Sequence, residues 1–150
     1  MKKFKFQLAT LLKVTKMKKD EAEVAFAKAA RRLAEENDKL SLYLQEMQTA
    51  HRDYEELTNE KTIPLGRLTA FNSYFDWKRR QIEAQQTVIL QAKAEHQKKL
   101  KELMAIMNRL KSIEELKKKR YNEYMAEFLA EEQKELDEIG LQLFARRKSS

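Results

Sequence analysis

The chain has 150 residues, of which 42% are hydrophobic and 37% are charged, with two Gly, one Pro and no Cys. A composition rich in Lys, Glu, Ala, Leu and Gln is typical of long helices, and so few turn residues argue against sandwich, barrel and βαβ folds. The absence of Cys excludes disulfides, thiolate metal sites and cysteine nucleophiles.

The net charge of +7 is concentrated at the N-terminus, because residues 1–19 contain seven Lys and no acidic residue. Such a basic end attracts an acidic or anionic surface. Lys13 and Lys16 interrupt the apolar segment that a signal peptide would need, so we expect the N-terminus to be retained. No apolar run reaches the roughly 18 residues of a membrane-spanning helix, and none is expected.

The first helix is predicted over residues 5–58, because apolar residues recur there at every seventh position. One series consists of Phe26, Leu33, Leu40, Met47 and Tyr54, and the series three positions further on consists of Ala29, Glu36, Tyr43, Ala50 and Leu57. Extended backward, the same register includes Leu8, Leu12, Thr15, Lys19 and Ala22. A repeat sustained over this length indicates a coiled-coil helix.

A turn is predicted at residues 59–66, which contain the only Pro and one of the two Gly. Pro64 cannot lie inside a helix without breaking a hydrogen bond, and it disfavours helical angles at Ile63. The repeat of the first helix also stops at this point.

The second helix is predicted over residues 67–140, followed by a short tail at 141–150. The alternative is that Leu141, Leu143 and Phe144 continue the helix past Gly140. Its repeat is Leu68, Phe75, Ile82, Ile89, His96, Leu103 and Leu110. Between residues 72 and 93 the accompanying series is largely polar in either of two registers: Asn72, Arg79, Gln86 and Lys93, or Phe71, Lys78, Gln85 and Ala92. We therefore expect loose pairing in this stretch. Further on, either Glu114 and Lys117 occupy core positions before the apolar stripe resumes at Tyr121, Tyr124 and Phe128, or the stripe shifts locally to Ile113 and Leu116.

Two long helices joined by a short link predict an all-α fold, a single-domain antiparallel coiled-coil hairpin. If Leu57 lies beside Leu68, paired residue numbers sum to about 125, and Lys5 faces roughly Arg120. The second helix is then longer and has a C-terminal overhang. Its apolar side consists of Met125, Phe128, Leu129, Leu136 and Ile139. Because an unpaired apolar stripe is unfavourable in water, we expect it to dock on a partner, self-associate or fray.

The sequence predicts no catalytic residue, no metal site and no cofactor. His51 and His96 lie in different helices without metal-ligand spacing, and no Gly-rich phosphate loop is present. A hairpin of this kind also offers little scope for an enclosed pocket. We therefore expect a protein that is not an enzyme and binds neither a small-molecule substrate nor nucleic acid.

Aromatic residues gather near the start of the second helix, at Phe71, Tyr74, Phe75 and Trp77. Trp77 lies off the apolar seam in either register. Because Trp and Tyr are frequent at binding hot spots, Tyr74 and Trp77 predict a contact patch. The alternative is that Trp77 only covers neighbouring aliphatic stems.

Three segments together resemble the FliJ family of bacterial flagellar export proteins. They are residues 4–12 (FKFQLATLL), residues 71–77 (FNSYFDW) and residues 132–138 (EQKELDE). The length, the central turn and the charge fit as well, so the resemblance covers nearly the whole chain.

The resemblance implies a cytoplasmic component of the flagellar type III export apparatus, peripheral to the inner membrane. Members of the family look like the central stalk of rotary ATPases. The resemblance implies that the chain, monomeric alone, binds and stimulates the hexameric export ATPase (FliI). It further implies that the chain links this ATPase to the export gate protein FlhA and to export chaperones.

The resemblance also assigns residues to two sites. The end that binds the ATPase contains Phe4, Leu8, Leu12, Phe128, Gln133, Lys134, Leu136, Asp137 and Glu138. The patch that binds the export gate contains Tyr74, Lys78, Gln81 and Gln85, and Trp77 is added to it as an expected binding hot spot.

Two alternative functions remain open at the level of sequence. The first is a generic coiled-coil scaffold, which would self-associate through the overhang. The second is a basic helix that binds a membrane surface through its N-terminal apolar residues, Phe4, Phe6, Leu8, Leu11 and Leu12, among the surrounding Lys.

Overall fold

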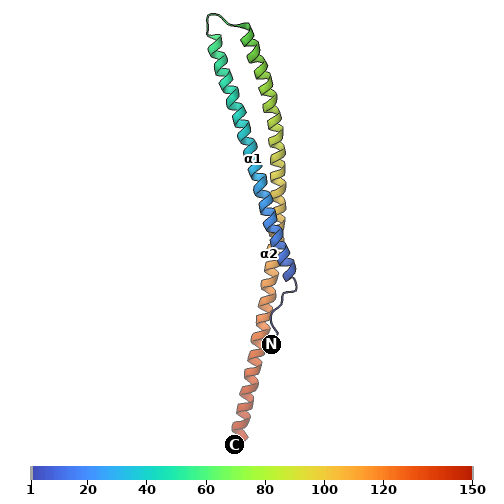
Figure 1. The fold of residues 1–150 in the computed structure, drawn as a ribbon. Helices are drawn as coiled ribbons and strands as arrows, with labels where there is room; N and C mark the ends of the chain where they lie inside the picture. Colours follow the sequence, from blue (N-terminus) through green and yellow to red (C-terminus); the bar gives the residue numbers. More distant parts are fainter. Residues whose placement is uncertain (1, 150) are drawn as a thin grey trace. The chain divides into compact units, whose positions relative to one another are not determined.

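The computed structural model describes residues 2–149, which form two helices and no strand (Figure 1). Helix α1 spans Ala9–Thr58 with 50 residues, and helix α2 spans Leu65–Ser149 with 85 residues. The predicted all-α helical hairpin with a longer second helix is therefore confirmed. Within residues 2–149, neither helix has an apolar stretch long enough to cross a membrane.

The contacts within the chain define two units. The central unit consists of Glu21–Met104, and the terminal unit consists of the residues up to Asp20 together with those from Ala105 onward. Each unit contains a part of α1 or the segment before it and a part of α2, and each is described by itself below.

The connection between the helices lies in the central unit and is shorter than predicted, because α2 begins at Leu65 rather than at residue 67. The carbonyl oxygen of Pro64 accepts hydrogen bonds from the backbone N–H groups of Arg67 and Leu68, at 3.1 and 3.2 Å. Proline is well suited to a helix start, since its missing N–H would have no partner in the helix and its φ angle is already helical.

The central unit is held by side chains at the predicted seam positions. Its buried apolar residues are Ala29, Ala50, Leu57, Phe75, Ile89, Ala92 and Leu103. Rings from the two helices also stack across the contact: Phe26 on His96 and His51 on Phe75, with centroids 4.9 and 4.4 Å apart. The paired residue numbers lie close to the predicted sum, so the register read from the sequence is correct here.

The expectation of loose pairing between residues 72 and 93 was wrong. The structure uses the register that contains Phe71, Lys78, Gln85 and Ala92, and its two polar members are buried. Lys78 pairs with Glu46 of α1, and Gln85 donates hydrogen bonds to Glu36 of α1. Polar side chains are tolerated in a helix contact when their hydrogen bonds are satisfied there, and these long side chains reach partners on α1.

The terminal unit has a small apolar core formed by Leu12, Leu110 and Ile113, against which Phe6 packs. The apolar stripe of α2 shifts to Ile113 and the half-buried Leu116, whereas Glu114 and Lys117 are exposed. This settles the choice between the two continuations of the repeat.

Both outer helix ends differ from the prediction. Helix α1 begins at Ala9 rather than at residue 5, because Phe4 and Phe6 pack against α2 instead of continuing the helix. Helix α2 continues through Gly140 to Ser149, so residues 141–149 are not a separate tail, and the alternative continuation through Leu141, Leu143 and Phe144 is correct. One helical Gly costs about 1 kcal/mol, and strong helix formers around it offset this cost. The last turn is also basic, with Arg146, Arg147 and Lys148, which suits the negative end of the helix dipole.

Candidate partner-binding sites

The N-terminal segment before α1 is fixed to α2 within the terminal unit. The ring of Phe4 lies 5.3 Å from that of Tyr121 and 5.5 Å from that of Tyr124. The Tyr124 hydroxyl donates a 2.6 Å hydrogen bond to the carbonyl oxygen of Lys2. Of the predicted ATPase-binding residues near the N-terminus, Leu12 is buried and Phe4 is half-buried, so both hold the unit together. Leu8 is exposed.

The rest of the predicted ATPase-binding end lies on α2 in the same unit. Phe128 is half-buried, and every residue from Leu129 to Ser149 is exposed. The predicted residues Gln133, Lys134, Leu136, Asp137 and Glu138 are therefore all accessible, and the amide of Gln133 donates to the Asp137 carboxylate at 3.1 Å. The terminal unit thus contains all nine predicted residues.

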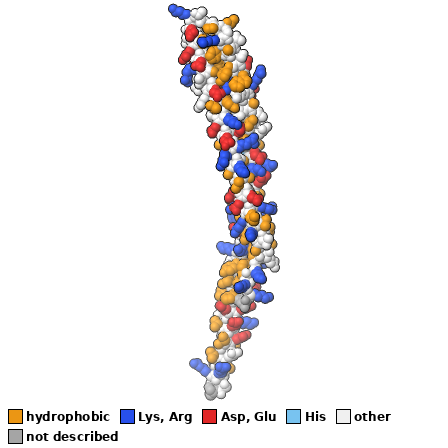
Figure 2. Space-filling model, viewed as in Figure 1, with side chains coloured by type: hydrophobic (Ala, Val, Ile, Leu, Met, Phe, Trp, Pro, Cys, Tyr) orange, Lys and Arg blue, Asp and Glu red, His pale blue; other side chains and the backbone are white. Residues whose placement is uncertain are grey.

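An apolar stripe runs along this exposed part of α2. We call it the C-terminal stripe and define it as Leu129, Leu136, Ile139 and Leu143, which are between 52% and 62% exposed. On the face visible in Figure 2, apolar side chains lie among charged ones over this part of α2. Leu129, Leu136 and Leu143 are seven residues apart, which is the spacing that packs against another helix.

The terminal unit also carries the basic residues of the chain's N-terminus. Lys5 and Arg120 line one groove of about 420 Å³, in agreement with the predicted pairing of these two positions. A second groove lies between Lys2 and Lys3 and the acidic residues Glu127 and Glu131. Glu123 and Glu127 line the first groove as well, and Arg120 pairs with Glu123 at 3.5 Å, so the basic side chains of this end lie among acidic ones.

The predicted gate-binding patch lies in the central unit, and the structure divides it into exposed and buried members. Trp77 is 55% exposed, and Tyr74 and Gln81 are half-buried. Lys78 and Gln85 are buried, with exposed fractions of 1% and 7%. A partner could therefore touch Trp77, Tyr74 and Gln81, whereas Lys78 and Gln85 contribute to the contact between the helices.

The ammonium group of Lys78 is enclosed by oxygen atoms and aromatic rings, which we call the Lys78 cage. It pairs with the Glu46 carboxylate and donates a 2.8 Å hydrogen bond to Oε1 of Gln81. The rings of Tyr43, Tyr74 and Trp77 lie 5.1, 5.5 and 4.7 Å from Nζ, within the range of a cation–π interaction. Sequence reasoning missed this cage, because it requires the register that places Tyr43 and Glu46 opposite Lys78.

A second polar contact, one heptad further along α2, joins Gln85 to Glu36. The Gln85 amide donates to the Glu36 carbonyl oxygen at 2.8 Å and to its carboxylate at 2.6 Å. The hydrogen bond from Gln85 holds the pKa of Glu36 below its usual value of 4.5. Desolvation opposes this shift, and Lys39 and Arg32 reinforce it. This contact is therefore strongest while the Glu36 carboxylate is ionised.

We expect the central unit to lose stability as the pH falls through and below the usual pKa of a glutamate carboxyl, in part through Glu36, whose pKa is lowered in the fold. A carboxyl group whose pKa is lower in the folded state stabilises the fold above its unfolded pKa, and this contribution is lost as the pH falls through its folded pKa. Urea unfolding followed by Trp77 fluorescence at several pH values measures the effect. The Glu36→Gln variant, which has no carboxylate to protonate, should show a flatter acid limb. Parallel curves for the two proteins would contradict this prediction.

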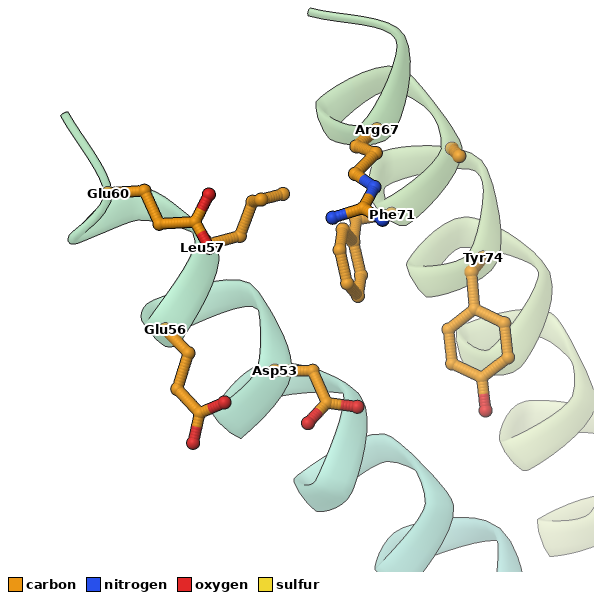
Figure 3. Close-up of a pocket in the computed structure, with 8 residues that line it drawn as sticks. Asp53, Glu56, Leu57, Glu60, Arg67, Phe71 and Tyr74 are labelled. Carbon is orange, nitrogen blue, oxygen red and sulfur yellow. The ribbon is translucent and has the colours of Figure 1, made fainter. Parts of the chain in front are cut away.

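A hollow of about 460 Å³ lies beside the connection in the central unit (Figure 3). Leu57 and Phe71 form its apolar part, and Tyr74 borders it on α2. Its charged residues are Asp53, Glu56, Glu60 and Arg67. No motif in the sequence signals this hollow. Because Tyr74 also contacts Trp77, with centroids 5.9 Å apart, the hollow adjoins the predicted gate patch.

Among residues 2–149, no group of three or more His, Asp or Glu side chains is arranged to hold a metal ion. In comparisons with known proteins, a family model described as "Flagellar FliJ protein" matches residues 4–149. Neither a curated protein nor a solved structure matches the chain significantly.

Proposed function

The chain belongs to the FliJ family of flagellar proteins and is a component of flagellar protein export, and we propose that it acts there as a non-catalytic stalk. In this role it binds and stimulates the hexameric export ATPase, FliI, in the cytoplasm at the flagellar base. It connects this ATPase to the export gate protein FlhA and to export chaperones. The terminal unit contacts the ATPase, and the central unit contacts the gate.

The observation that carries this proposal is the exposed C-terminal stripe of the terminal unit. Leu136 and Ile139 are 62% and 52% exposed, on a stretch of α2 in which every residue from Leu129 to Ser149 is exposed. Exposure of apolar side chains to water is unfavourable, and the free energy falls when another protein covers them. The stripe includes Leu136, which also belongs to the segment 132–138 that resembles the family.

The stalk acts through differential contact and makes or breaks no covalent bond. A hexamer that hydrolyses ATP passes through several arrangements of its subunits, and a bound stalk favours those that it contacts best. By linkage, each change in the ATPase alters the free energy of stalk binding, which couples ATP turnover to the partners bound at the central unit.

Addition of the chain is expected to raise the rate of ATP hydrolysis by the assembled export ATPase several-fold. The physical reason is that a bound stalk shifts the populations of the hexamer states, and a coupling free energy of about 1–3 kcal/mol corresponds to roughly 5- to 150-fold shifts in such an equilibrium. Phosphate release by purified FliI, titrated with the chain at a fixed ATP concentration, provides the measurement. Unchanged turnover with an ATPase that is demonstrably hexameric would reject the stalk role.

The structure weakens the membrane-surface alternative. Of the five apolar residues on which it depends, Phe4 and Phe6 pack in the terminal unit and Leu12 is buried, so only Leu8 and Leu11 are exposed. The scaffold alternative predicts self-association through the C-terminal stripe. Light scattering at micromolar concentration distinguishes it from the stalk, which we expect to be monomeric alone.

A further inference from the structure

We infer that Lys78 is a positioning residue, which holds Trp77 and Tyr74 in the orientation that they present to the export gate protein. This inference rests on the proposed function, because that function assigns Tyr74 and Trp77 to the gate contact. The inference changes the role of Lys78 itself, from a residue that a partner touches to one that acts through its neighbours.

The geometry of Lys78 leaves it little opportunity to touch a partner. Its side chain is 2% exposed, and its ammonium group already has oxygen partners on both helices, Glu46 on α1 and Gln81 on α2. An ammonium group has three N–H donors, and a buried charge is stable only when these are satisfied. The remaining directions around Nζ are occupied by rings, so the group is fixed from several sides.

The same contacts constrain the aromatic side chains that do reach the surface. Trp77 is 55% exposed, yet its ring lies 4.7 Å from the Lys78 ammonium and 5.9 Å from the ring of Tyr74. Tyr74 also lies on Lys78, at 5.5 Å. An exposed side chain normally loses rotamer freedom when a partner covers it, and this loss reduces the affinity. A Trp held by a cation before binding loses less, so the Lys78 cage preorganises this surface.

Residues of both helices form the Lys78 cage, so the orientation of Trp77 and Tyr74 depends on the packing of α1 against α2. Glu46 and Tyr43 come from α1, whereas Tyr74, Trp77 and Gln81 come from α2. Lys78 also remains charged at neutral pH. Burial lowers its pKa, but the hydrogen bond to Glu46 and the proximity of Tyr74 more than compensate and raise the pKa above 10.5.

The Lys78→Met variant tests the inference because it removes the charge and leaves the helix contact filled. Met is unbranched, close to Lys in length and adaptable in packing. The Glu46 carboxylate, at 39% side-chain exposure, can be hydrated once its partner is gone. A matched control is Lys99→Met, since Lys99 is a half-buried lysine of the same helix whose partners are Glu95 and Glu102.

Two readouts are used, and the first needs no partner. Trp77 is the only Trp of the chain, so its fluorescence and its quenching by acrylamide report on this site alone. We expect quenching to increase in Lys78→Met and to stay unchanged in Lys99→Met, with equal helicity by circular dichroism. The second readout is affinity for the purified cytoplasmic part of FlhA, which should fall about three- to tenfold in Lys78→Met, because Trp77 must then be ordered on binding.

Unchanged quenching in Lys78→Met overturns the inference, whatever happens to FlhA binding. Increased quenching with full affinity also overturns it, because the orientation of Trp77 would then have no consequence for the partner. The Trp77→Ala variant keeps these results separate from the proposed function. If it binds FlhA as the wild type does, the gate assignment fails, and quenching alone decides whether Lys78 positions Trp77. Should Lys78→Met lose helicity, Glu46→Gln replaces it, with the same two expectations.

Discussion

Replacement of both Leu136 and Ile139 by Gln is expected to weaken binding to the export ATPase about 100-fold and to abolish its stimulation. Both side chains are more than half exposed in the chain alone, so a partner that covers them gains most of their burial free energy. Each contributes about 1.5 kcal/mol on burial, and the loss of about 3 kcal/mol corresponds to roughly two orders of magnitude in the dissociation constant. A titration of ATPase activity with each protein measures both effects.

The fold of the variant should remain intact, which makes the result interpretable. Gln has nearly the helix propensity of Leu, and an exposed position contributes little to stability. Helicity and the urea midpoint should therefore match those of the wild type.

A matched control is available on α1. Leu42 and Leu44 are 51% and 49% exposed in the central unit, so Leu42→Gln with Leu44→Gln removes a similar apolar area elsewhere. This control should stimulate the ATPase normally. Full stimulation by the Leu136 and Ile139 variant, or equal loss in the control, would show that the C-terminal stripe does not bind the ATPase.

The fold was predictable because periodicity in the sequence specifies both helices and their register. Positions such as Phe26 and His96, or Tyr54 and Phe71, were paired by the repeat and by the place of Pro64, and their rings are in contact. A heptad repeat is a property of the sequence alone, since each member reappears on the same side of its helix. The two units defined by the contacts were not predicted, and a single domain remains a prediction.

The helix ends were less predictable, because they depend on contacts between distant residues. Phe6 packs against Leu110 instead of continuing the helix, and Phe4 before it contacts Tyr121 and Tyr124, all more than a hundred positions away. Gly140 was interpreted as a stop signal, but helix formers on both sides carry the helix past it. Helix propensity assigns every helical Gly about the same unfavourable free energy, and only the surrounding residues determine whether the helix ends there.

The roles of individual site residues needed the structure. Exposure of the C-terminal signature follows from the unequal helix lengths and was expected from the sequence. The burial of Lys78 and Gln85 was not expected. Polar residues at the seam of a coiled coil predict weak pairing unless their hydrogen-bond partners are known. Glu46 and Glu36 become partners only when α1 is placed against α2. The hollow beside the connection was not predictable either, because its lining residues come from both helices and form no sequence motif.

The Leu110→Ala variant is expected to lower the stability of the terminal unit by about 2–4 kcal/mol and to release the N-terminal segment. Leu110 is 8% exposed and forms the core of this unit with Leu12, Ile113 and Phe6. Truncation to Ala removes the apolar contact and leaves a cavity, and a core of so few residues has little else to compensate. Because Phe6 then loses its packing partner, the hydrogen bond from Tyr124 to Lys2 should break as well.

Two measurements detect this change. The urea midpoint should fall by about 1–2 M, given a typical dependence on urea of about 1–3 kcal/mol per molar. Limited proteolysis should cleave the segment before α1 much faster than in the wild type. Met107→Ala is the control, since Met107 lies one turn earlier on α2 and is 47% exposed, and its effect should stay below about 1 kcal/mol. If Leu110→Ala keeps the N-terminal segment protected, then Phe4 and its contacts with Tyr121 and Tyr124 fix the segment without the core, and Leu12, Leu110 and Ile113 serve only the start of α1.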